Sequence, residues 1–329
     1  MTSTQHWPGG LDPELAAEKA RKFPLLARNR SLAGFDFERE GKWKGAFCFV
    51  QAADTQLGMM RNFVPHLPAQ REKVVNWEPE VAIMQRCVEA VNRMQPRPRF
   101  FIVCGDLVDA MPWVEYRWQQ VRDYKAVLSD LHADIKPVCV CGNHDVGDTP
   151  TAQTIGQYVS DFGDDYFSFW VGGVKFLVIN SQFYADSSNV RKLQEQHDSW
   201  LDQQLASQPE QSWKHLVGFQ HIPPFLHDKE EDAVDVFGIP NLNFNFADRN
   251  IRKQFLTKLK QAGVRKLFCG HYHRNAGGWD DHLEVVVTSA VGCQLGEDTH
   301  GLRIVSVLED RIEHKYYSVS DLPSTIDLR

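Results

Sequence analysis

Short apolar runs alternate with longer amphipathic segments along most of the chain. The apolar runs have the length of β-strands and are AFCFVQAA (46–53), RFFIVCG (99–105), KPVCVCG (136–142), VKFLVIN (174–180), HLVGFQ (215–220), VRKLFCG (264–270), LEVVVTSAVG (283–292) and LRIVSVL (302–308). Apolar residues recur at helical spacing in 79–94, 114–132, 191–205 and 249–262. Strands that alternate with helices predict an α/β protein with a parallel or mixed sheet.

Two further features of the pattern bear on the architecture. The segment YFSFWVGGVKFLVIN (166–180) places two apolar runs around Gly172 and Gly173, which predicts an antiparallel hairpin. Two sheets packed face to face would accommodate this hairpin beside the parallel strands. Residues 1–44 are polar apart from one helix-compatible stretch, Asp12 to Lys22. We expect them to form an N-terminal extension packed on a main domain of residues 45–329.

The composition excludes several classes of protein. The chain has 329 residues, 43% of them hydrophobic, and is long enough to bury a large core. Its net charge of -7 provides no basic surface for a nucleic acid or an anionic membrane. The N-terminus MTSTQHWPGG does not have the pattern of a secretory signal, and no apolar run approaches the roughly 18 residues of a membrane span. We therefore expect a soluble intracellular protein without nucleic-acid or membrane partners, and we further expect a monomer.

The cysteines are odd in number, and most lie inside apolar runs. Cys48, Cys104, Cys139, Cys141 and Cys269 are of this kind. We interpret them as reduced core residues rather than as disulfide partners. Cys139 and Cys141 also fit a C-x-C metal site, but alternation along a strand places both on one buried face, which favours a packing role.

Polar residues of the kinds that bind metals follow five of the predicted strands. They are Asp54, Asp106, Asn143 with His144, His221, and His271 with His273. Loops at the carboxyl ends of strands in α/β sheets converge on one edge, where the sheet holds them rigidly, so we expect these side chains to form one site. Oxygen and nitrogen donors without a thiolate suit Mn, Fe, Zn or Mg.

Three of the candidate ligands directly follow a glycine. The pairs are Gly105-Asp106, Gly142-Asn143 and Gly270-His271. Glycine permits a sharp turn out of a strand and a close approach of the backbone. His271 and His273 are two residues apart, so in an extended loop both imidazoles can point to one pocket, each bound to a different ion.

Taken in order, these motifs resemble the signature of the calcineurin-like metallophosphoesterases, which runs D-x-H, GD-x-x-D, GNH-[DE], a lone His and GH-x-H. Longer stretches, GNHDVGDTPTAQTIGQYV, GDDYFSFWVGGVKFLVINSQFY, FQHIPPFL and GHYHRNAGG, are similar to members of this family that act on phosphoproteins. The resemblance covers most of residues 45–320. It implies a four-layer αββα fold of two mixed sheets flanked by helices, two divalent metal ions, a cytoplasmic location and protein serine/threonine phosphatase activity.

The resemblance also assigns roles to individual residues. The first metal ion would be held by Asp54, Gln56, Asp106 and His273, and the second by Asp106, Asn143, His221 and His271. A hydroxide shared by the two ions would attack phosphorus in line. His144 would protonate the departing alkoxide, and Asp109 would hold the ring of His144 and favour its charged form.

Gln56 departs from the family pattern, which has a histidine at this position. An amide oxygen is a harder and usually weaker donor than imidazole, so we expect a looser first metal that favours Mn or Mg over Zn. Direct ligation, ligation through a water molecule and no ligation are all open for Gln56. Arg61 and Arg274 lie near ligands and are open to phosphate contacts or to surface ion pairs.

The function is open among three alternatives. The first is a phosphatase that acts on phosphoproteins, and the resemblance suggests Akt-type kinases as substrates. The second is an enzyme that acts on a small phosphodiester or phosphomonoester such as a cyclic nucleotide, and the third is a binding module without catalysis.

Residues 227–250 form a long connection that is acidic early (Asp228, Glu230, Glu231, Asp232 and Asp235) and then carries Phe237, Phe244 and Phe246. This connection is either a rim that selects substrates or a solvated insertion.

Overall fold

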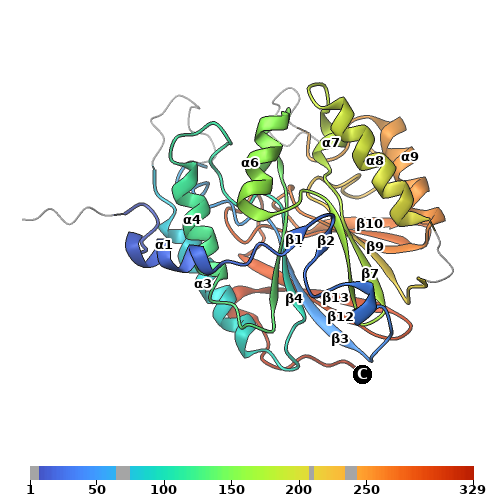
Figure 1. The fold of residues 1–329 in the computed structure, drawn as a ribbon, viewed down its shortest axis with the longest axis horizontal. Coiled ribbons are helices and arrows are strands. Elements are labelled where there is room, and N and C mark those ends of the chain that lie inside the picture. The colour runs from blue at the N-terminus through green and yellow to red at the C-terminus, as the bar shows by residue number, and fades with distance from the viewer. Residues whose placement is uncertain (1–6, 64–74, 207–210, 234–242) are drawn as a thin grey trace, which may run out of the picture.

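The computed structural model describes residues 7–63, 75–206, 211–233 and 243–329. Two β-sheets lie face to face at its centre, and helices cover the outer face of each sheet (Figure 1). This arrangement confirms the predicted α/β architecture of four layers.

The larger sheet has eight strands. Their spatial order is β1 (Ala27–Arg28), β2 (Ser31–Leu32), β6 (Phe167–Val171), β7 (Val174–Val178), β8 (Leu216–Phe219), β9 (Val264–Cys269), β11 (Leu283–Val287) and β10 (Ala276–Asp280). Strands β7, β8, β9 and β11 are parallel, whereas β6 and β10 pair antiparallel on either side of them. The predicted hairpin is β6 and β7, which turn at Gly172 and Gly173 with φ of 53° and 86°.

The smaller sheet has five strands. Their order is β13 (Ile312–Ser318), β12 (Gly301–Val307), β3 (Phe47–Ala52), β4 (Phe100–Cys104) and β5 (Lys136–Val140). Strands β3, β4 and β5 are parallel, and β12 and β13 continue the sheet in antiparallel pairing. The carboxyl ends of β3, β4 and β5 therefore meet at one edge.

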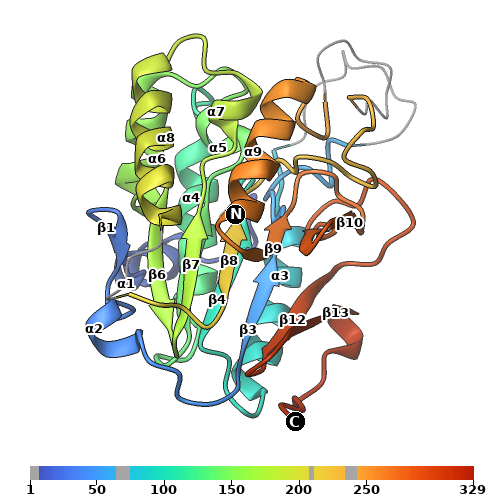
Figure 2. The ribbon, with the colours of Figure 1, turned by 90° about the vertical axis from the view of Figure 1, so that its right-hand side faces the viewer.

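Helices cover both outer faces of the sheet pair (Figures 1 and 2). On the smaller sheet these are α3 (Glu78–Arg93), α4 (Arg117–Leu128) and α6 (Ala152–Phe162); on the larger sheet they are α8 (Arg191–Leu205) and α9 (Arg249–Gln261). The short helices α2 (Phe37–Glu40), α5 (Asn143–Val146), α7 (Gln182–Ala185) and η1 (Val319–Asp321) lie in connections.

Four of these helices confirm the helical segments predicted after residue 45, with small shifts at their ends. Helix α6 was not predicted, because weak helix formers such as Thr154 and Gly156 interrupt its apolar pattern. Thr151 begins α6 by accepting a hydrogen bond from the backbone N–H of Thr154 at 3.1 Å.

The N-terminal segment contacts both sheet layers. Helix α1 (Pro13–Lys22) begins at Asp12, whose carboxylate accepts a hydrogen bond from the N–H of Leu15, and it packs against α4. Strands β1 and β2 extend the larger sheet beside β6. Phe35 lies among the residues buried between the sheets. The segment therefore shares a sheet with the main domain, and the boundary at residue 45 stays a prediction.

All seven cysteines are buried and free. Burial raises the pKa of the Cys139 thiol to about 12 and that of Cys141 well above its usual range. Both side chains pack in the cluster under α4 and α6, as predicted for core residues. Within the described ranges, no helix is both long and apolar enough to cross a membrane.

Aromatic rings fill the space between the two sheets. Phe100 of β4 is fully buried and stacks on Phe49 of β3 with ring centroids 4.5 Å apart. Its edge contacts Phe169 and Phe176 of the larger sheet at 5.3 and 5.2 Å. These contacts hold the two sheets in one relative position, which the site described below requires.

We predict that Phe100→Ala lowers the free energy of unfolding by about 3–5 kcal/mol, because it leaves a cavity between the sheets. The measurement is the urea unfolding midpoint by circular dichroism. Leu15→Ala on the surface of α1, where the side chain is 49% exposed, is the control and should change stability by less than about 0.5 kcal/mol. Equal effects of the two substitutions would contradict the proposed role of the aromatic layer.

Candidate dinuclear metal site

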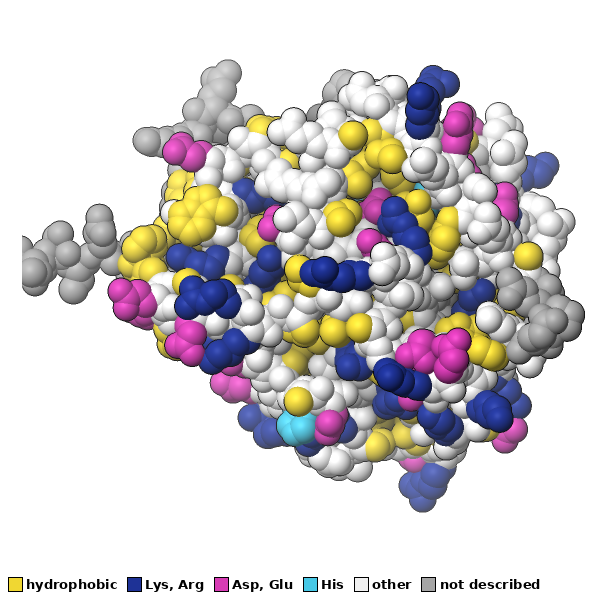
Figure 3. Space-filling view, in the orientation of Figure 1, with side chains coloured by type: hydrophobic (Ala, Val, Ile, Leu, Met, Phe, Trp, Pro, Cys, Tyr) yellow, Lys and Arg dark blue, Asp and Glu magenta, His cyan; other side chains and the backbone are white. Residues whose placement is uncertain are grey.

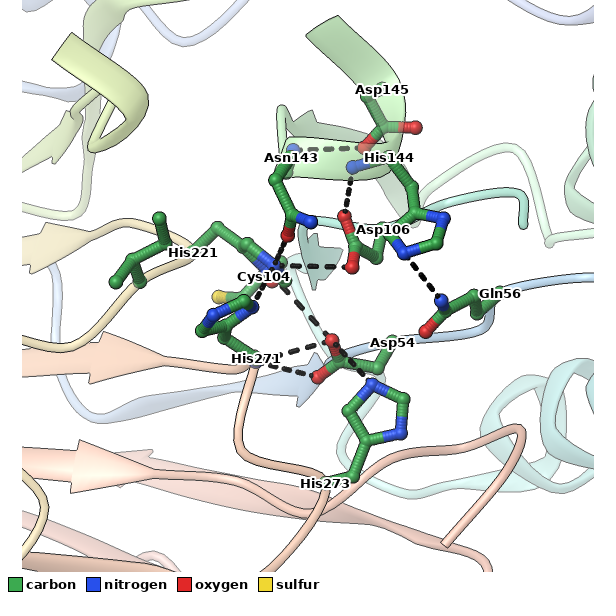
Figure 4. A network of polar contacts seen from close by, with 12 residues as sticks. Asp54, Gln56, Cys104, Asp106, Asn143, His144, Asp145, His221, His271 and His273 are labelled. Atoms are coloured by element: carbon green, nitrogen blue, oxygen red, sulfur yellow. Dashed lines mark hydrogen bonds and ion pairs between the residues drawn. The ribbon is translucent and has the colours of Figure 1, made fainter. Parts of the chain in front are cut away.

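The predicted ligands come together where strands of both sheets end. Asp54 and Gln56 follow β3, Asp106 follows β4, Asn143 follows β5, His221 follows β8, and His271 and His273 follow β9. The side chains of these seven residues are buried. Figure 4 shows them pointing toward a common centre from separate loops.

The backbone at this cluster has an unusual conformation. Asp54, Gln56, Asp106, His271 and His273 have φ of 50°, 35°, 50°, 71° and 52°. Residues other than glycine rarely adopt this left-handed region, and such conformations concentrate at functional sites. The loops are therefore held in place by their surroundings rather than by local preference.

The potential ligand atoms form two groups that share one residue. Asp106, His221 and His271 offer atoms within 4.8 Å of one another, and so do Asp54, Asp106 and His273. His221 Nε2 lies 3.3 Å from Asp106 Oδ2, and His273 Nε2 lies 3.3 Å from Asp54 Oδ1. The two groups, which share Asp106, could hold divalent cations.

Backbone carbonyls orient the three imidazoles. His221 donates from Nδ1 to the carbonyl of Cys104 at 2.8 Å, and His273 donates from Nδ1 to that of Cys293 at 2.5 Å. His271 donates from Nε2 to the carbonyl of Asn243 at 3.1 Å. The opposite nitrogen of each ring, Nε2 of His221 and His273 and Nδ1 of His271, thereby faces the cluster. The sequence does not reveal these contacts, because every residue has a carbonyl.

Asn143 is turned so that its oxygen faces the cluster. Its Nδ2 donates to Asp148 Oδ1 at 2.9 Å, and its Oδ1 lies 3.2 Å from His221 Nε2. The backbone N–H groups of His144 and His271 donate to Asp106 Oδ1 and Asp54 Oδ2, each at 2.9 Å. Asp148 is a further functional residue that the sequence motifs did not single out.

Gln56 presents its amide in a defined orientation. Nε2 lies 3.1 Å from His144 Nε2 and 3.3 Å from Asp109 Oδ1. Oε1 is buried and has no hydrogen-bond partner within the described residues, and Figure 4 shows it facing the space beside Asp54 and Asp106. A buried acceptor without a donor is costly, and a cation at this position would satisfy it.

His144 lies beside the cluster with its ring 24% exposed. Its Nδ1 donates to the backbone carbonyl of Asp109 at 2.7 Å, whereas the Asp109 carboxylate is 3.7 Å from the same nitrogen. Burial opposes the charged form of His144, but the carboxylates of Asp106 and Asp109 outweigh it and raise the pKa of the imidazole. The predicted support by Asp109 therefore comes from its carbonyl as well as from its charge.

Buried charges at the centre offset one another. Burial disfavours ionisation of Asp106, but the imidazoles of His221 and His144 hold the pKa of its carboxyl well below its usual range. Burial likewise opposes a charged His221, yet Asp106 raises the pKa of this imidazole to about 9. Burial and the adjacent His221 lower the pKa of His271 to about 3. Ligation of a metal by His221 must therefore release a proton below pH 9.

The glycines of the motifs are required by close approach. A Cβ at Gly142 would lie 2.1 Å from Asp106 Oδ1, and one at Gly270 would lie 2.6 Å from Asp54 Oδ2. A Cβ at Gly105 would lie 2.3 Å from His221 Nδ1. Each glycine therefore makes room for a ligand that another strand delivers.

Arg117 is a supporting residue that no motif indicated. It is 2% exposed and donates to the carbonyls of Ala110 and His144, the latter at 2.9 Å. It thus ties the loop after β4 to helix α5. Arg274, by contrast, donates to the carbonyl of Leu295 at 2.9 Å. Its guanidinium is therefore held by an intramolecular hydrogen bond.

Part of the connection 227–250 contacts the cluster directly. Asn243 accepts from His271, and the ring of Phe244 lies 5.3 Å from that imidazole. Buried Arg252 of α9 holds the segment by donating to the carbonyls of Lys229 and Phe246 at 3.0 and 2.6 Å. Asp235 and Phe237, which the sequence prediction included, lie outside the described residues.

Known proteins are similar to this chain in sequence and in fold. Residues 49–275 match the family model described as Calcineurin-like phosphoesterase. The chain is 47% identical over 297 residues to serine/threonine-protein phosphatase CPPED1 of Mus musculus, covering 90% of this chain and 91% of that protein. The protein of the same name from Danio rerio is 45% identical over 299 residues, covering 91% and 93%.

Solved structures agree on the fold. A dimetal phosphatase from Danio rerio superposes with a TM-score of 0.57 at 16% identity, covering 84% of this chain and 97% of that chain. At this identity the likeness concerns the fold alone. The family model and the relatives, however, each span most of the chain and agree with the order of the motifs. The chain therefore belongs to the calcineurin-like phosphoesterase family.

Proposed function

We propose that this protein is a metal-dependent phosphatase that removes phosphate from phosphoserine and phosphothreonine in proteins. The observation that carries the proposal is the pair of ligand groups that share Asp106. The relatives that match most of the chain bear the name serine/threonine-protein phosphatase, which supports the choice of substrate class.

The site residues fit two divalent cations. Asp54, Gln56, Asp106 and His273 would hold one, and Asp106, Asn143, His221 and His271 the other. The unpaired Oε1 of Gln56 and the orientation of the three imidazoles support this assignment. When bound, such ions lower the pKa of a water molecule and offset the charge of phosphoryl oxygens. With an amide oxygen in place of an imidazole, Mn or Mg is favoured over Zn.

His144 would act as the acid that protonates the departing serine or threonine oxygen. Its Nδ1 donates to the Asp109 carbonyl, so Nε2, which lies 3.1 Å from Gln56 Nε2, is the end of the ring that would donate the proton to substrate. The surrounding carboxylates raise the pKa of His144, which favours the protonated ring. Asp109 would fix the ring through its carbonyl and favour the charged form through its carboxylate.

The proposal also covers the oligomeric state, the location and the partners of the protein. We infer a monomer in the cytoplasm, with no nucleic-acid or membrane partner, that acts on phosphoproteins such as Akt-type kinases. The net charge of -7 and the acidic start of the 227–250 connection support phosphopeptides with basic residues near the phosphate over highly anionic nucleotides.

Comparing substrates tests the proposal. Metal-loaded protein is assayed with phosphoserine peptides, phosphotyrosine peptides and bis-p-nitrophenyl phosphate, and we expect the highest kcat/KM for phosphoserine. Preference for the diester would instead support a phosphodiesterase of small molecules. Metal binding without turnover of any substrate would indicate a binding module.

Asp106→Asn should abolish hydrolysis. Removal of residues that merely orient a ligand costs about 10–100-fold, so loss of the shared ligand should lower kcat by more than about 100-fold and weaken metal binding. Turnover and calorimetric titration with Mn²⁺ provide the two measurements. Asp130→Asn on the surface is the matched control and should behave as wild type. Full activity of Asp106→Asn would refute the assignment.

Gln56→His should tighten the first metal site and shift its preference toward Zn, because imidazole is the softer and stronger donor. Titration of the metal-free protein with Mn²⁺, Mg²⁺ and Zn²⁺ measures the affinities of both sites. If Gln56→His changes neither affinity nor preference, Gln56 is not a direct ligand.

His144→Asn should lower kcat for phosphoserine peptides by about 10²–10⁴-fold and should affect p-nitrophenyl phosphate much less, because nitrophenolate leaves without a proton. In the wild-type protein, kcat for phosphoserine should fall as the pH rises through the raised pKa of His144, since the acid form is lost. Equal losses on both substrates would show that His144 does not act as the acid.

A further inference from the structure

A groove that the proposed chemistry does not use lies between α1, α4 and α6. It has a volume of about 440 Å³, and its lining includes Arg21, Trp118, Arg122, Lys125 and Asp161. In Figure 3, Lys and Arg side chains gather over α1 and α4, next to exposed hydrophobic side chains. The groove therefore combines cationic and apolar surface.

The charge of the groove is opposite to that of the whole chain. Arg21, Arg122 and Lys125 face it, whereas Asp161 contributes the carboxylate of the lining; the chain has a net charge of -7. Arg122 pairs with buried Asp123 at 2.7 Å, and Lys125 lies 3.8 Å from Asp161. Burial outweighs the attraction of Asp161 and lowers the pKa of Lys125. Because its lining holds more cations than carboxylates, the groove favours an anionic ligand.

An exposed aromatic platform lies along the same groove. Trp118 is 59% exposed, although a large indole is usually covered. The guanidinium of Arg122 lies 5.7 Å from the ring of Trp118 and 5.8 Å from that of Trp7. Tryptophan and arginine are the residue types that contribute most energy in protein interfaces. The groove thus offers an apolar anchor directly beside its cations.

The groove adjoins the proposed active site through Arg117. This residue belongs to the groove lining, and its guanidinium donates to the carbonyl of His144 at 2.9 Å and to that of Asp145 at 3.3 Å. This side chain therefore contacts both the groove and the segment that carries the proposed acid.

We propose that the groove between α1, α4 and α6 binds an acidic segment of the phosphoprotein substrate, remote in sequence from the phosphorylated residue. Trp118 contacts an apolar side chain of that segment, and Arg21 and Arg122 attract its carboxylates. The inference rests on the proposed function, because it concerns how a protein substrate is recognised. Two separate surfaces then bind the substrate. One binds the basic residues near the phosphate, and the groove binds the acidic segment farther away.

The test compares two phosphoserine peptides. Both carry the same phosphorylated sequence and a Gly/Ser linker, in several lengths, followed by a segment with one leucine and either four glutamates or four glutamines. For the wild-type protein we expect KM to be about tenfold lower for the glutamate peptide, with kcat unchanged. The advantage should shrink as salt is raised, because exposed charges are screened.

Matched variants locate the effect. In Trp118→Ala and Arg21→Glu, KM for the glutamate peptide should rise to that of the glutamine peptide. Lys22→Glu makes the same change of charge one residue away, outside the groove lining, and Trp279→Ala removes another exposed tryptophan; both should retain the advantage. Turnover of p-nitrophenyl phosphate in each variant reports whether the metal site is intact.

The outcomes separate the two proposals. If both peptides are hydrolysed with equal KM, or if the advantage persists in Trp118→Ala and Arg21→Glu, the docking groove is wrong and the phosphatase proposal stands. If neither peptide is hydrolysed while bis-p-nitrophenyl phosphate is, the proposed function fails. Fluorescence anisotropy of the labelled, unphosphorylated glutamate segment then tests the groove independently of turnover. Binding that Trp118→Ala does not weaken would refute the groove.

Discussion

The site depends on an ionised carboxylate, Asp106, at the centre of a buried cluster. An isolated carboxylate in this position would take up a proton, because burial disfavours charge. Here the imidazoles of His221 and His144 surround it, and the N–H of His144 donates to it at 2.9 Å. Since Asp106 belongs to both ligand groups, this one buried charge determines how the two halves of the site lie relative to each other.

The fold meets this requirement because strands of both packed sheets end at the site. The smaller sheet supplies Asp54 and Asp106, and the larger sheet supplies His221 and His271. The N–H of His271 donates to Asp54, and His221 donates to the carbonyl of Cys104, so hydrogen bonds cross from one sheet to the other inside the site. The aromatic layer beneath holds the sheets at the spacing that these bonds require.

In our proposals, chemistry and substrate recognition involve different parts of the molecule. The candidate ligands follow strand ends, Asn243 and Phe244 of the 227–250 connection contact His271, and the groove beside α4 is lined by other residues. In folds that host many activities, such peripheral surfaces distinguish one substrate from another while the central chemistry is retained. Arg117 contacts both the candidate site and the groove, because it donates to the carbonyl of His144 and also lines the groove.

The amino-acid sequence by itself determined most strands and helices, the order of the candidate ligands and the exception at Gln56, because hydrophobic periodicity and residue type express these features locally. It did not indicate α6, whose packing compensates for weak helix formers. Only the tertiary structure decided which atoms face the centre of the cluster. The carbonyls of Cys104, Cys293 and Asn243 orient the imidazoles, and a carbonyl carries no signature in a sequence. The orientation of Gln56 and the support from Arg117 likewise depend on distances between segments that only the packed chain brings together.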